Sequence, residues 1–334
     1  MSGGLLIQLV VDGFRCALCL WIWLAFAGRS KRVITTSMVL SCEVVKILCA
    51  VVVVSFQGKV MELVRQWTLR DSLTCSALPA AIYALQNYLI QIAYQNLDFL
   101  SFTMLNQTKL LFTAFFMFIL LRHKQSLPQM GALVLMVVAA VMLTIGQATP
   151  SAVSLTGLNN FRKGALSVPS FLAKVLLDTK ALYTGVIPVL SASVLSGLAS
   201  TLCQMAMQNK GRNTYLMTVE MSLAGSLVLL CSMLRSPDGD KIVKQGFFYA
   251  WEKTTMIPVV SNAFGGIMVG VVTKHVGGVK KGFAIVSALI VTGIGQVLID
   301  GHLPSPYVWV SLPLVVGSTL IHTRYPYVKQ VKTV

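Results

Sequence analysis

The chain has 334 residues, of which 55% are hydrophobic and only 11% are charged. A soluble globular protein carries about 25% charged residues, so this composition excludes the soluble class and predicts an integral membrane protein. The formal net charge is +16, but the basic residues are scattered singly between apolar runs, which favours loops beside anionic lipid headgroups over a nucleic-acid-binding face.

Ten segments are long and apolar enough to cross a bilayer, which takes about 20 mainly apolar residues. In chain order they are residues 5–27, 33–56, 77–95, 101–121, 128–145, 182–204, 215–234, 255–273, 282–299 and 306–323. The first segment has no basic region before it, so we expect it to be retained as a span rather than cleaved as a signal peptide. The predicted fold class is an all-α integral membrane protein of about ten transmembrane helices.

The longest connection divides these helices into two groups of five. We predict a first five-helix repeat over residues 1–145, a connecting link over 146–181, and a second repeat with a short C-terminal tail over 182–334. Because five is odd, a second half of the same fold starts on the opposite side of the membrane, as in the inverted repeats of many secondary transporters. Two local patterns lie in the links: an interfacial helix at 167–177, and a turn signal at Ser236-Pro237-Asp238-Gly239.

Ionisable residues within these spans are functional hypotheses, because a charge is costly inside a bilayer. Two pairs stand three residues apart on a single helix, namely Asp12 with Arg15 and Glu43 with Lys46. Side chains at that spacing can neutralise each other on one helix face. For Glu43 and Lys46 we predict a structural ion pair.

Lys109 and Lys281 have no acidic residue within one helical turn. Glu220 could neutralise one of them, and the other would still lack a partner. A ligand with about two negative charges, such as a nucleotide phosphate group, would satisfy both lysines. The alternative is that a lysine snorkels to the interface, which suits Lys281 at the start of its span better than Lys109.

The predicted spans near Lys109 are unusually polar. Buried amides and phenols need hydrogen-bond partners, so these residues predict the wall of a wet cavity that could recognise a base or a sugar. The second half adds small residues that let helices approach closely. The candidates from these two groups are Tyr83, Gln86, Asn87, Gln107, Ser196, Gly197 and Gly266.

No cofactor, metal or catalytic group is predicted. Cys16 and Cys19 have metal-ligand spacing, but their neighbours are apolar and no histidine or second pair accompanies them. A membrane enzyme would need catalytic carboxylates or histidines at one membrane face, and the four histidines are scattered. A channel would need a ring of like residues or a filter sequence, which is not visible.

Several short motifs follow one another over nearly the whole chain. They are Glu43-Val44-Val45-Lys46, Ala84-Leu85-Gln86-Asn87, Asn96-Leu97-Asp98, Gln107-Thr108-Lys109, Ser196-Gly197-Leu198-Ala199, Gly246-Phe247-Phe248-Tyr249, Gly265-Gly266 and Lys281-Gly282-Phe283. Together they resemble the Golgi nucleotide-sugar transporters, above all the CMP-sialic acid and UDP-galactose transporters. The stretches 202–205 and 215–220 depart from the animal proteins and look like the plant proteins labelled CMP-sialic acid transporter-like.

The resemblance implies a fold of the drug/metabolite transporter type and an antiporter mechanism with alternating access. A cytosolic nucleotide sugar, either CMP-sialic acid-like or a UDP-sugar, would exchange for lumenal CMP or UMP. The lysines that match Lys109 and Lys281 contact the phosphate in that family, and the departing stretch adds the candidates Tyr215, Thr218 and Glu220. The expected location is the Golgi membrane, with the endoplasmic reticulum as the alternative.

Two further expectations concern partners and the rival function. The lipid bilayer is the expected environment, no nucleic acid is expected to bind, and a homodimer stays open. An organic-phosphate or metabolite carrier of the same fold is the alternative function. The polar spans favour a larger, hydrogen-bonded cargo over such a small one, but without the resemblance they favour it only weakly.

Overall fold

The structure is a computed structural model that describes residues 33–58, 60–65, 67–97, 99–122, 124–148, 182–234, 236–283 and 306–325. Every regular element in these ranges is a helix. Four expectations lie outside the described residues: the span at 5–27, the pair of Asp12 and Arg15, the interfacial helix at 167–177, and most of the span at 282–299.

The remaining predicted spans correspond to helices within a few residues of the expected limits. They are α2 (Thr35–Phe56), α5 (Leu78–Asn96), α6 (Phe99–Asn106) with α7 (Lys109–Leu121), α8 (Leu127–Ala148), α11 (Ile187–Gln208), α12 (Thr214–Met233), α14 (Met256–Val276) and α16 (Pro306–Arg324). Short helices fill the links: α3 (Val60–Arg65), α4 (Leu69–Ser72), α13 (Pro237–Gln245) and the 3-10 helix η3 (Lys253–Thr255). The π-helical segments η1 (Leu73–Ala77) and η2 (Leu182–Val186) lead directly into α5 and α11.

Five described segments are long and apolar enough to cross a membrane. They are Thr35–Phe56, Phe102–Leu121, Leu182–Gln208, Thr214–Met233 and Met256–Val276. The prediction of an all-helical membrane protein is therefore confirmed for the described part of the chain. The finer prediction of ten helices in two repeats stays a prediction.

The chain forms two compact units, and each unit takes residues from both halves of the sequence. The first unit comprises Met1–Ala84 and Leu202–Gly277, and the second comprises Leu85–Thr201 and Gly278–Val334. The boundaries fall inside α5 and α11, so both helices contribute to both units. The predicted repeats over 1–145 and 182–334 concern an internal symmetry that this division does not test.

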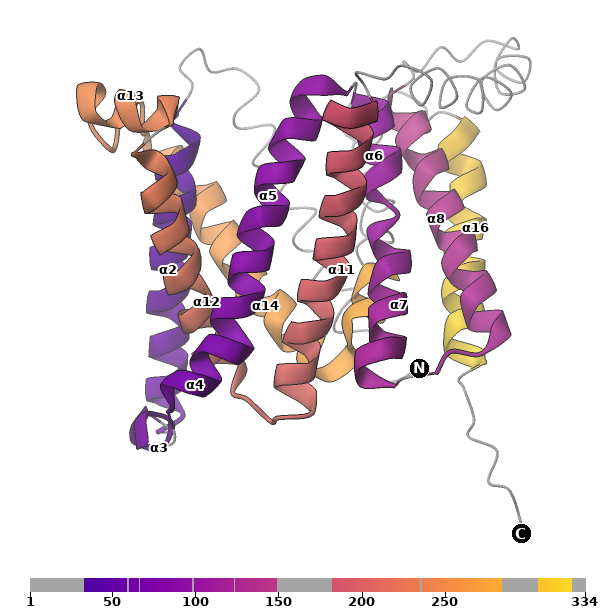
Figure 1. The fold of residues 1–334 in the computed structure, drawn as a ribbon, viewed down its shortest axis with the longest axis horizontal. Coiled ribbons are helices and arrows are strands. Elements are labelled where there is room, and N and C mark those ends of the chain that lie inside the picture. Colours follow the sequence, from indigo (N-terminus) through magenta and orange to yellow (C-terminus); the bar gives the residue numbers. More distant parts are fainter. Residues whose placement is uncertain are drawn as a thin grey trace. The chain divides into compact units, whose positions relative to one another are not determined.

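Helix α2 lies beside α12 and α14 in the first unit, and Figure 1 shows α2 and α12 side by side. Cys42 of α2 packs with Val259 and Ala263 of α14 in a small apolar cluster. The indole N–H of Trp251 donates to the hydroxyl of Ser37 at 3.1 Å. These contacts hold the link before α14 against the start of α2.

The segment expected to form a plain turn at 236–239 is instead the start of α13, so that expectation was wrong. Ser236 caps the helix by accepting from the Gly239 N–H at 3.2 Å, and Pro237 occupies the first turn. A serine cap followed by proline starts a helix as readily as it makes a turn. Asp238 accepts from the Thr36 hydroxyl at 2.9 Å, and a carboxylate is favourable there, at the N-terminus of α2.

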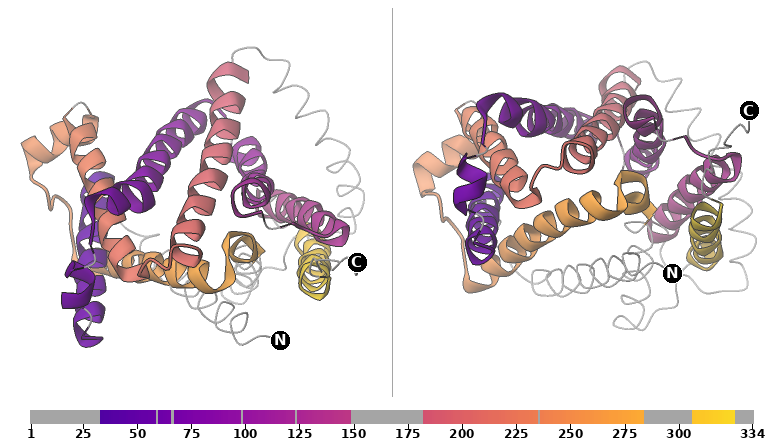
Figure 2. Two further views of the ribbon diagram at one scale, coloured as in Figure 1. Left: turned by 60° about the horizontal axis from the view of Figure 1, so that its bottom comes forward. Right: turned by 90° about the horizontal axis from the view of Figure 1, so that it is seen from below.

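Helices α8 and α16 lie side by side in the second unit, as all views in Figures 1 and 2 show. Ser126 and Gln129 form a reciprocal cap at the start of α8, with nitrogen–oxygen distances of 3.1 and 3.3 Å. The Ser126 hydroxyl donates to the Tyr325 carbonyl at 2.7 Å, and the Gln129 amide donates to the His322 carbonyl at 3.2 Å. These bonds join the start of α8 to the end of α16.

The predicted continuous helix at 101–121 is interrupted at Gln107 and Thr108, between α6 and α7 (Figure 1). The N–H groups of these two residues bond to carbonyls three residues back, at 3.2 and 3.1 Å. The Thr108 hydroxyl donates to the Leu105 carbonyl at 2.6 Å and takes up that acceptor. A hydroxyl that competes for a backbone acceptor in this way favours a local departure from the helix.

Candidate functional site

Lys109 is the first residue of α7 and stands directly at the interruption of the span. The residue is partly buried, and no described carboxylate pairs with its ammonium group. The N–H groups of Leu110 and Leu111 bond to the carbonyls of Gln107 and Thr108, at 3.2 and 2.9 Å, so the charge at this point comes from the lysine itself. An interrupted membrane helix of this kind is a typical site for an anionic substrate group. Gln107, also a predicted site residue, lies in the interruption itself.

Helix α11 approaches the backbone of α7 at Gly197. A Cβ atom on Gly197 would lie 2.7 Å from the backbone carbon of Phe112 and from the nitrogen of Thr113. The structure thus shows, in this helix, the close approach that small residues predicted. Ser196, the neighbouring candidate, is partly buried. Gly197 therefore positions α11 within one turn of Lys109.

Lys281 lies in a short helical segment, residues 278–283, that packs on the start of α7. A Cβ atom on Gly282 would lie 2.3 Å from Cδ1 of Leu110. Gly282 and Leu110 each adjoin one of the predicted lysines, so the second unit brings the two lysine-bearing segments together. Lys281 is partly buried and makes an interaction of its own. This region of the second unit is therefore rich in positive charge and suited to an anion.

The second unit also holds polar atoms that lack partners. The amide oxygen of Gln86 on α5 and the hydroxyl of Ser193 on α11 are buried with no hydrogen bond to any described residue. Asn87 is exposed, so the two adjacent amides of α5 face different surroundings. A buried polar atom without a partner calls for an explanation, such as an absent water or ligand.

The first unit contains the other polar candidates. Glu43 and Lys46 of α2 are 2.6 Å apart, which is the geometry of an ion pair. A Cβ atom on Gly266 would lie 3.0 Å from Cε of Lys46, so α14 gives room for the lysine stem at this glycine. Thr218 donates its hydroxyl to the Thr214 carbonyl of its own helix at 2.8 Å.

Two aromatic candidates occupy the first unit near the start of α12. Tyr83 is partly buried against a cluster that includes Cys75, Cys203 and Met217. Tyr215 lies in the first turn of α12, where its N–H donates to the capping side chain of Asn213 at 2.9 Å. The structure therefore places these residues beside the first unit's apolar core, and their substrate contacts stay a prediction.

Glu220 of α12 is the most heavily hydrogen-bonded carboxylate of the described residues. It is 8% exposed and accepts from the Trp67 indole at 2.9 Å and from the Ser76 hydroxyl at 2.5 Å. Arg212 pairs with both of its oxygens. Glu220 is thus neutralised by Arg212 within the first unit. The sequence had suggested it instead as a possible partner for Lys109 or Lys281.

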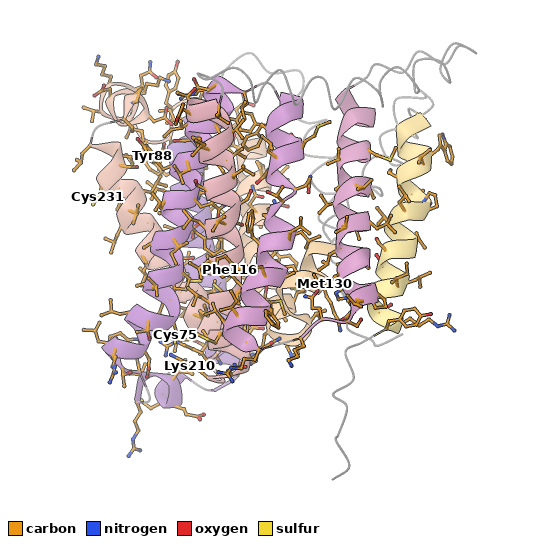
Figure 3. The ribbon with its side chains drawn as sticks, turned by 45° about the vertical axis from the view of Figure 1, so that its right-hand side comes forward. Cys75, Tyr88, Phe116, Met130, Lys210 and Cys231 are labelled. Atoms are coloured by element: carbon orange, nitrogen blue, oxygen red, sulfur yellow. The ribbon has the colours of Figure 1, made fainter. Side chains whose placement is uncertain are left out.

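Sequence reasoning did not single out Arg212, Trp67 or Ser76, which lie in or beside the links. Arg212 precedes Glu220 by eight residues, across the start of α12, so helical spacing does not reveal the pair. Further charged residues gather here: Lys210 donates to Cys75 at 3.5 Å, and Figure 3 shows these two labelled side chains at the same end of the unit. The Thr68 hydroxyl, which donates to Asp71, lowers the pKa of that carboxyl, and Arg212 and Lys210 add to the effect.

The close approach of α11 and α7 leads to a testable expectation for Gly197→Ala. The added methyl group would meet backbone atoms that cannot rotate away, so we expect a loss of about 1–3 kcal/mol in the free energy of unfolding. Gly131→Ala in α8 is the matched control, because nothing lies within 4 Å of its Cβ position. Thermal unfolding of the purified protein measures both. Equal midpoints would contradict the backbone contact.

Comparison with known proteins identifies the family. The family model described as "Nucleotide-sugar transporter" matches residues 5–323. The chain belongs to the nucleotide-sugar transporter family. The predicted resemblance is therefore confirmed at the level of the family. The family indicates a transporter rather than an enzyme, and no described group of three or more His, Cys, Asp or Glu residues is placed to hold a metal ion.

Relatives in the nucleotide-sugar transporter family carry names that specify a cargo. A UDP-N-acetylglucosamine transporter of Arabidopsis thaliana is 53% identical over 90% of this chain and 87% of its own length. The human UDP-N-acetylglucosamine transporter is 24% identical over 89% of this chain and 87% of its own length. The mouse UDP-galactose translocator is 25% identical over 74% of this chain and 57% of its own length. A solved crystal structure shares the fold with a TM-score of 0.62 at 13% identity, covering 95% of this chain and 98% of that one.

Proposed function

We propose that this nucleotide-sugar transporter carries a UDP-sugar and exchanges it for UMP. The plant UDP-N-acetylglucosamine transporter, 53% identical over most of both chains, supports a UDP-N-acetylhexosamine as the cargo. The sequence had left CMP-sialic acid and UDP-sugars open. The relatives described above, which are named for UDP-sugars, favour the uridine nucleotides, and CMP-sialic acid becomes the comparison cargo for the experiment below.

The meeting of the two lysine-bearing segments is the observation that carries the proposal. Lys109 begins α7 at the interruption, and Gly282, next to Lys281, packs on Leu110, next to Lys109. Lys109 pairs with no described carboxylate, and a cation inside a membrane protein favours an anionic ligand. A pyrophosphate or a monophosphate supplies this charge, whereas an uncharged sugar does not. The phosphates would thus be the common feature of both exchanged substrates.

The same electrostatics accounts for coupled exchange. A lysine at the centre of a membrane helix costs about 2.5–3.5 kcal/mol on insertion scales. An empty carrier keeps this cost for Lys109, whereas a bound nucleotide sugar or UMP neutralises that cation. If the change between the outward and inward states further dehydrates the site, only the loaded carrier crosses readily, because the ligand stabilises the crossing state more than the open ones. Antiport by alternating access follows from that difference.

The architecture proposed for this cycle is ten helices in two inverted five-helix repeats. In this plan α2, α5, α6 with α7, and α8 would belong to the first repeat, and α11 would begin the second. The interruption between α6 and α7 supports this plan, because broken helices carry the substrate site in transporters built from such repeats. The proposed location is the Golgi or endoplasmic reticulum membrane, with the substrate taken up from the cytosol.

Counterflow into proteoliposomes tests the function. Liposomes that contain the purified protein are loaded with UMP, CMP or buffer, and the uptake of labelled UDP-N-acetylglucosamine, UDP-galactose and CMP-sialic acid is followed. We expect UDP-sugar uptake only into UMP-loaded vesicles. If the only uptake is that of CMP-sialic acid into CMP-loaded vesicles, the protein carries a cytidine nucleotide instead of a uridine nucleotide. Equal uptake of UDP-sugars into UMP-loaded and empty vesicles would contradict coupled exchange. Transport of a small organic phosphate without any response to nucleotides would favour the alternative carrier.

A further inference from the structure

The joint between the start of α8 and the end of α16, within the second unit, holds two buried polar atoms that bond to no described residue. They are Oε1 of Gln125, in the link before α8, and Nε2 of His322, in the last turn of α16. His322 as a whole is only 6% exposed. A buried polar atom normally has a partner, either in the protein or in a bound molecule. The joint therefore offers an amide oxygen and a ring nitrogen to a molecule outside the chain.

The joint is held together by other atoms than these two. Gln125 precedes Ser126, whose hydroxyl donates to the Tyr325 carbonyl at 2.7 Å. The His322 backbone carbonyl accepts from the Gln129 amide at 3.2 Å. A substitution that removes only the Gln125 oxygen or the His322 ring nitrogen therefore leaves both of these bonds in place.

Positive charge surrounds the joint. Lys280 is exposed on the short segment 278–283 and is close enough to His322 to interact with it electrostatically. Phe283, one turn further along that segment, has its ring 4.6 Å from the ring of His322. Arg324 is exposed at the end of α16. The described residues of the second unit include no aspartate or glutamate, so none of them repels an anion at the joint.

An exposed apolar face of α8 begins at the same joint. Its side chains recur every three or four residues and so lie on one side of the helix, and Figure 3 labels one of them, Met130; they are Leu127, Met130, Val134 and Val138. The spans predicted at 128–145 and 306–323 both end at the joint, so the apolar face would meet acyl chains where the cations stand at the level of the lipid headgroups. A free phosphate ion would use the cations but not this face.

We propose that the joint of α8 and α16 binds an anionic phospholipid whose headgroup carries hydroxyl groups, as in phosphatidylinositol. Lys280 and the Nε2–H group of His322 contact the lipid phosphate, and Gln125 Oε1 accepts from a headgroup hydroxyl. The acyl chains lie along α8 from Leu127 to Val138. Basic sites between membrane helices are suited to such headgroups. The site lies wholly within the second unit and does not depend on which cargo the protein carries.

Native mass spectrometry of the purified protein, titrated with phosphatidylinositol, phosphatidic acid or phosphatidylcholine in detergent, measures the affinity for each lipid. We expect phosphatidylinositol to bind about tenfold more tightly than zwitterionic phosphatidylcholine. His322→Phe keeps a ring against Phe283 but removes the nitrogen, and Lys280→Gln removes the charge. Each should lower the affinity for phosphatidylinositol and phosphatidic acid alike by about tenfold. Lys244→Gln is the matched control, because it removes an exposed cation from α13 of the first unit.

Gln125→Met tests the hydroxyl contact separately and still decides the question if the His322 variant does not fold. It should lower the affinity for phosphatidylinositol about threefold and leave that for phosphatidic acid, which has no headgroup hydroxyl, unchanged. Equal binding of phosphatidylinositol and phosphatidylcholine by the wild-type protein would overturn the proposal. A preference for anionic lipid that survives all three substitutions at the joint would overturn it as well, because the charge of the whole protein would then suffice. Soluble inositol phosphate that binds as tightly as phosphatidylinositol would overturn the assignment to a lipid.

Discussion

Replacing Lys109 with methionine is expected to lower nucleotide-sugar exchange by about 10- to 100-fold while it stabilises the ligand-free protein. Exchange falls because a charge-assisted hydrogen bond to phosphate, of about 1.5–3 kcal/mol, is lost. Stability rises by about 1–3 kcal/mol because methionine has a similar length and removes a cation that pairs with no described carboxylate. Counterflow and the unfolding midpoint with and without UMP measure the two effects in the same preparation.

The opposite signs of the two effects make this expectation specific. Lys124→Met is the matched control, because Lys124 is exposed in the link before α8, and neither exchange nor the midpoint should change much. Lys109→Arg keeps the charge but changes the geometry of the donor, so it should restore only part of the exchange. A Lys109→Met protein that still exchanges at the wild-type rate would end the assignment of Lys109 to the phosphate.

Replacing Glu220 with glutamine is expected to lower the free energy of unfolding by about 3–5 kcal/mol. Glu220 and Arg212 are 8% and 10% exposed, so glutamine leaves a buried guanidinium without a counter-charge. Trp67 and Ser76 also lose the charge of their acceptor, which loosens the link before α5. Thermal or denaturant unfolding of the purified protein measures the change.

An exposed ion pair of the first unit provides the control for Glu220. Lys241 and Asp238 are 3.7 Å apart and 59% and 29% exposed, so Lys241→Ala should change the free energy of unfolding by less than about 1 kcal/mol. A double variant that replaces Glu220 and Arg212 with leucine and methionine should recover much of the loss, because neither charge then remains buried alone. If Glu220→Gln instead alters substrate affinity at unchanged stability, Glu220 contacts the substrate as the sequence first predicted.

Some features of this protein could be predicted because they depend on neighbours in the chain. The helical span at 33–56 follows from an apolar run that must satisfy its own backbone in lipid. The pairing of Glu43 with Lys46 follows from a spacing of three residues on one helix. The choice of Lys109 as a candidate, whose role stays a prediction, follows from the absence of a nearby acid and from the surrounding polar residues. Each of these inferences needs only local geometry.

Other features were missed although they are local, because one residue pattern suits two structures. At Gln107 and Thr108 the span is interrupted where the Thr108 hydroxyl bonds to the Leu105 carbonyl, and helical propensity does not reveal this. The start of α13 was taken for a turn, because serine and proline begin both structures.

The sequence by itself therefore determined the membrane class, most helices, the family and the candidate lysines, because hydrophobicity, helical period and short motifs are written along the chain. The tertiary structure decided which charges meet. It pairs Glu220 with Arg212 across the start of α12 and sets Gly282 against Leu110, although 171 residues separate Lys109 from Lys281. The physical reason is that the strength of a charge pair or a glycine contact depends on distance in space, which helix packing sets.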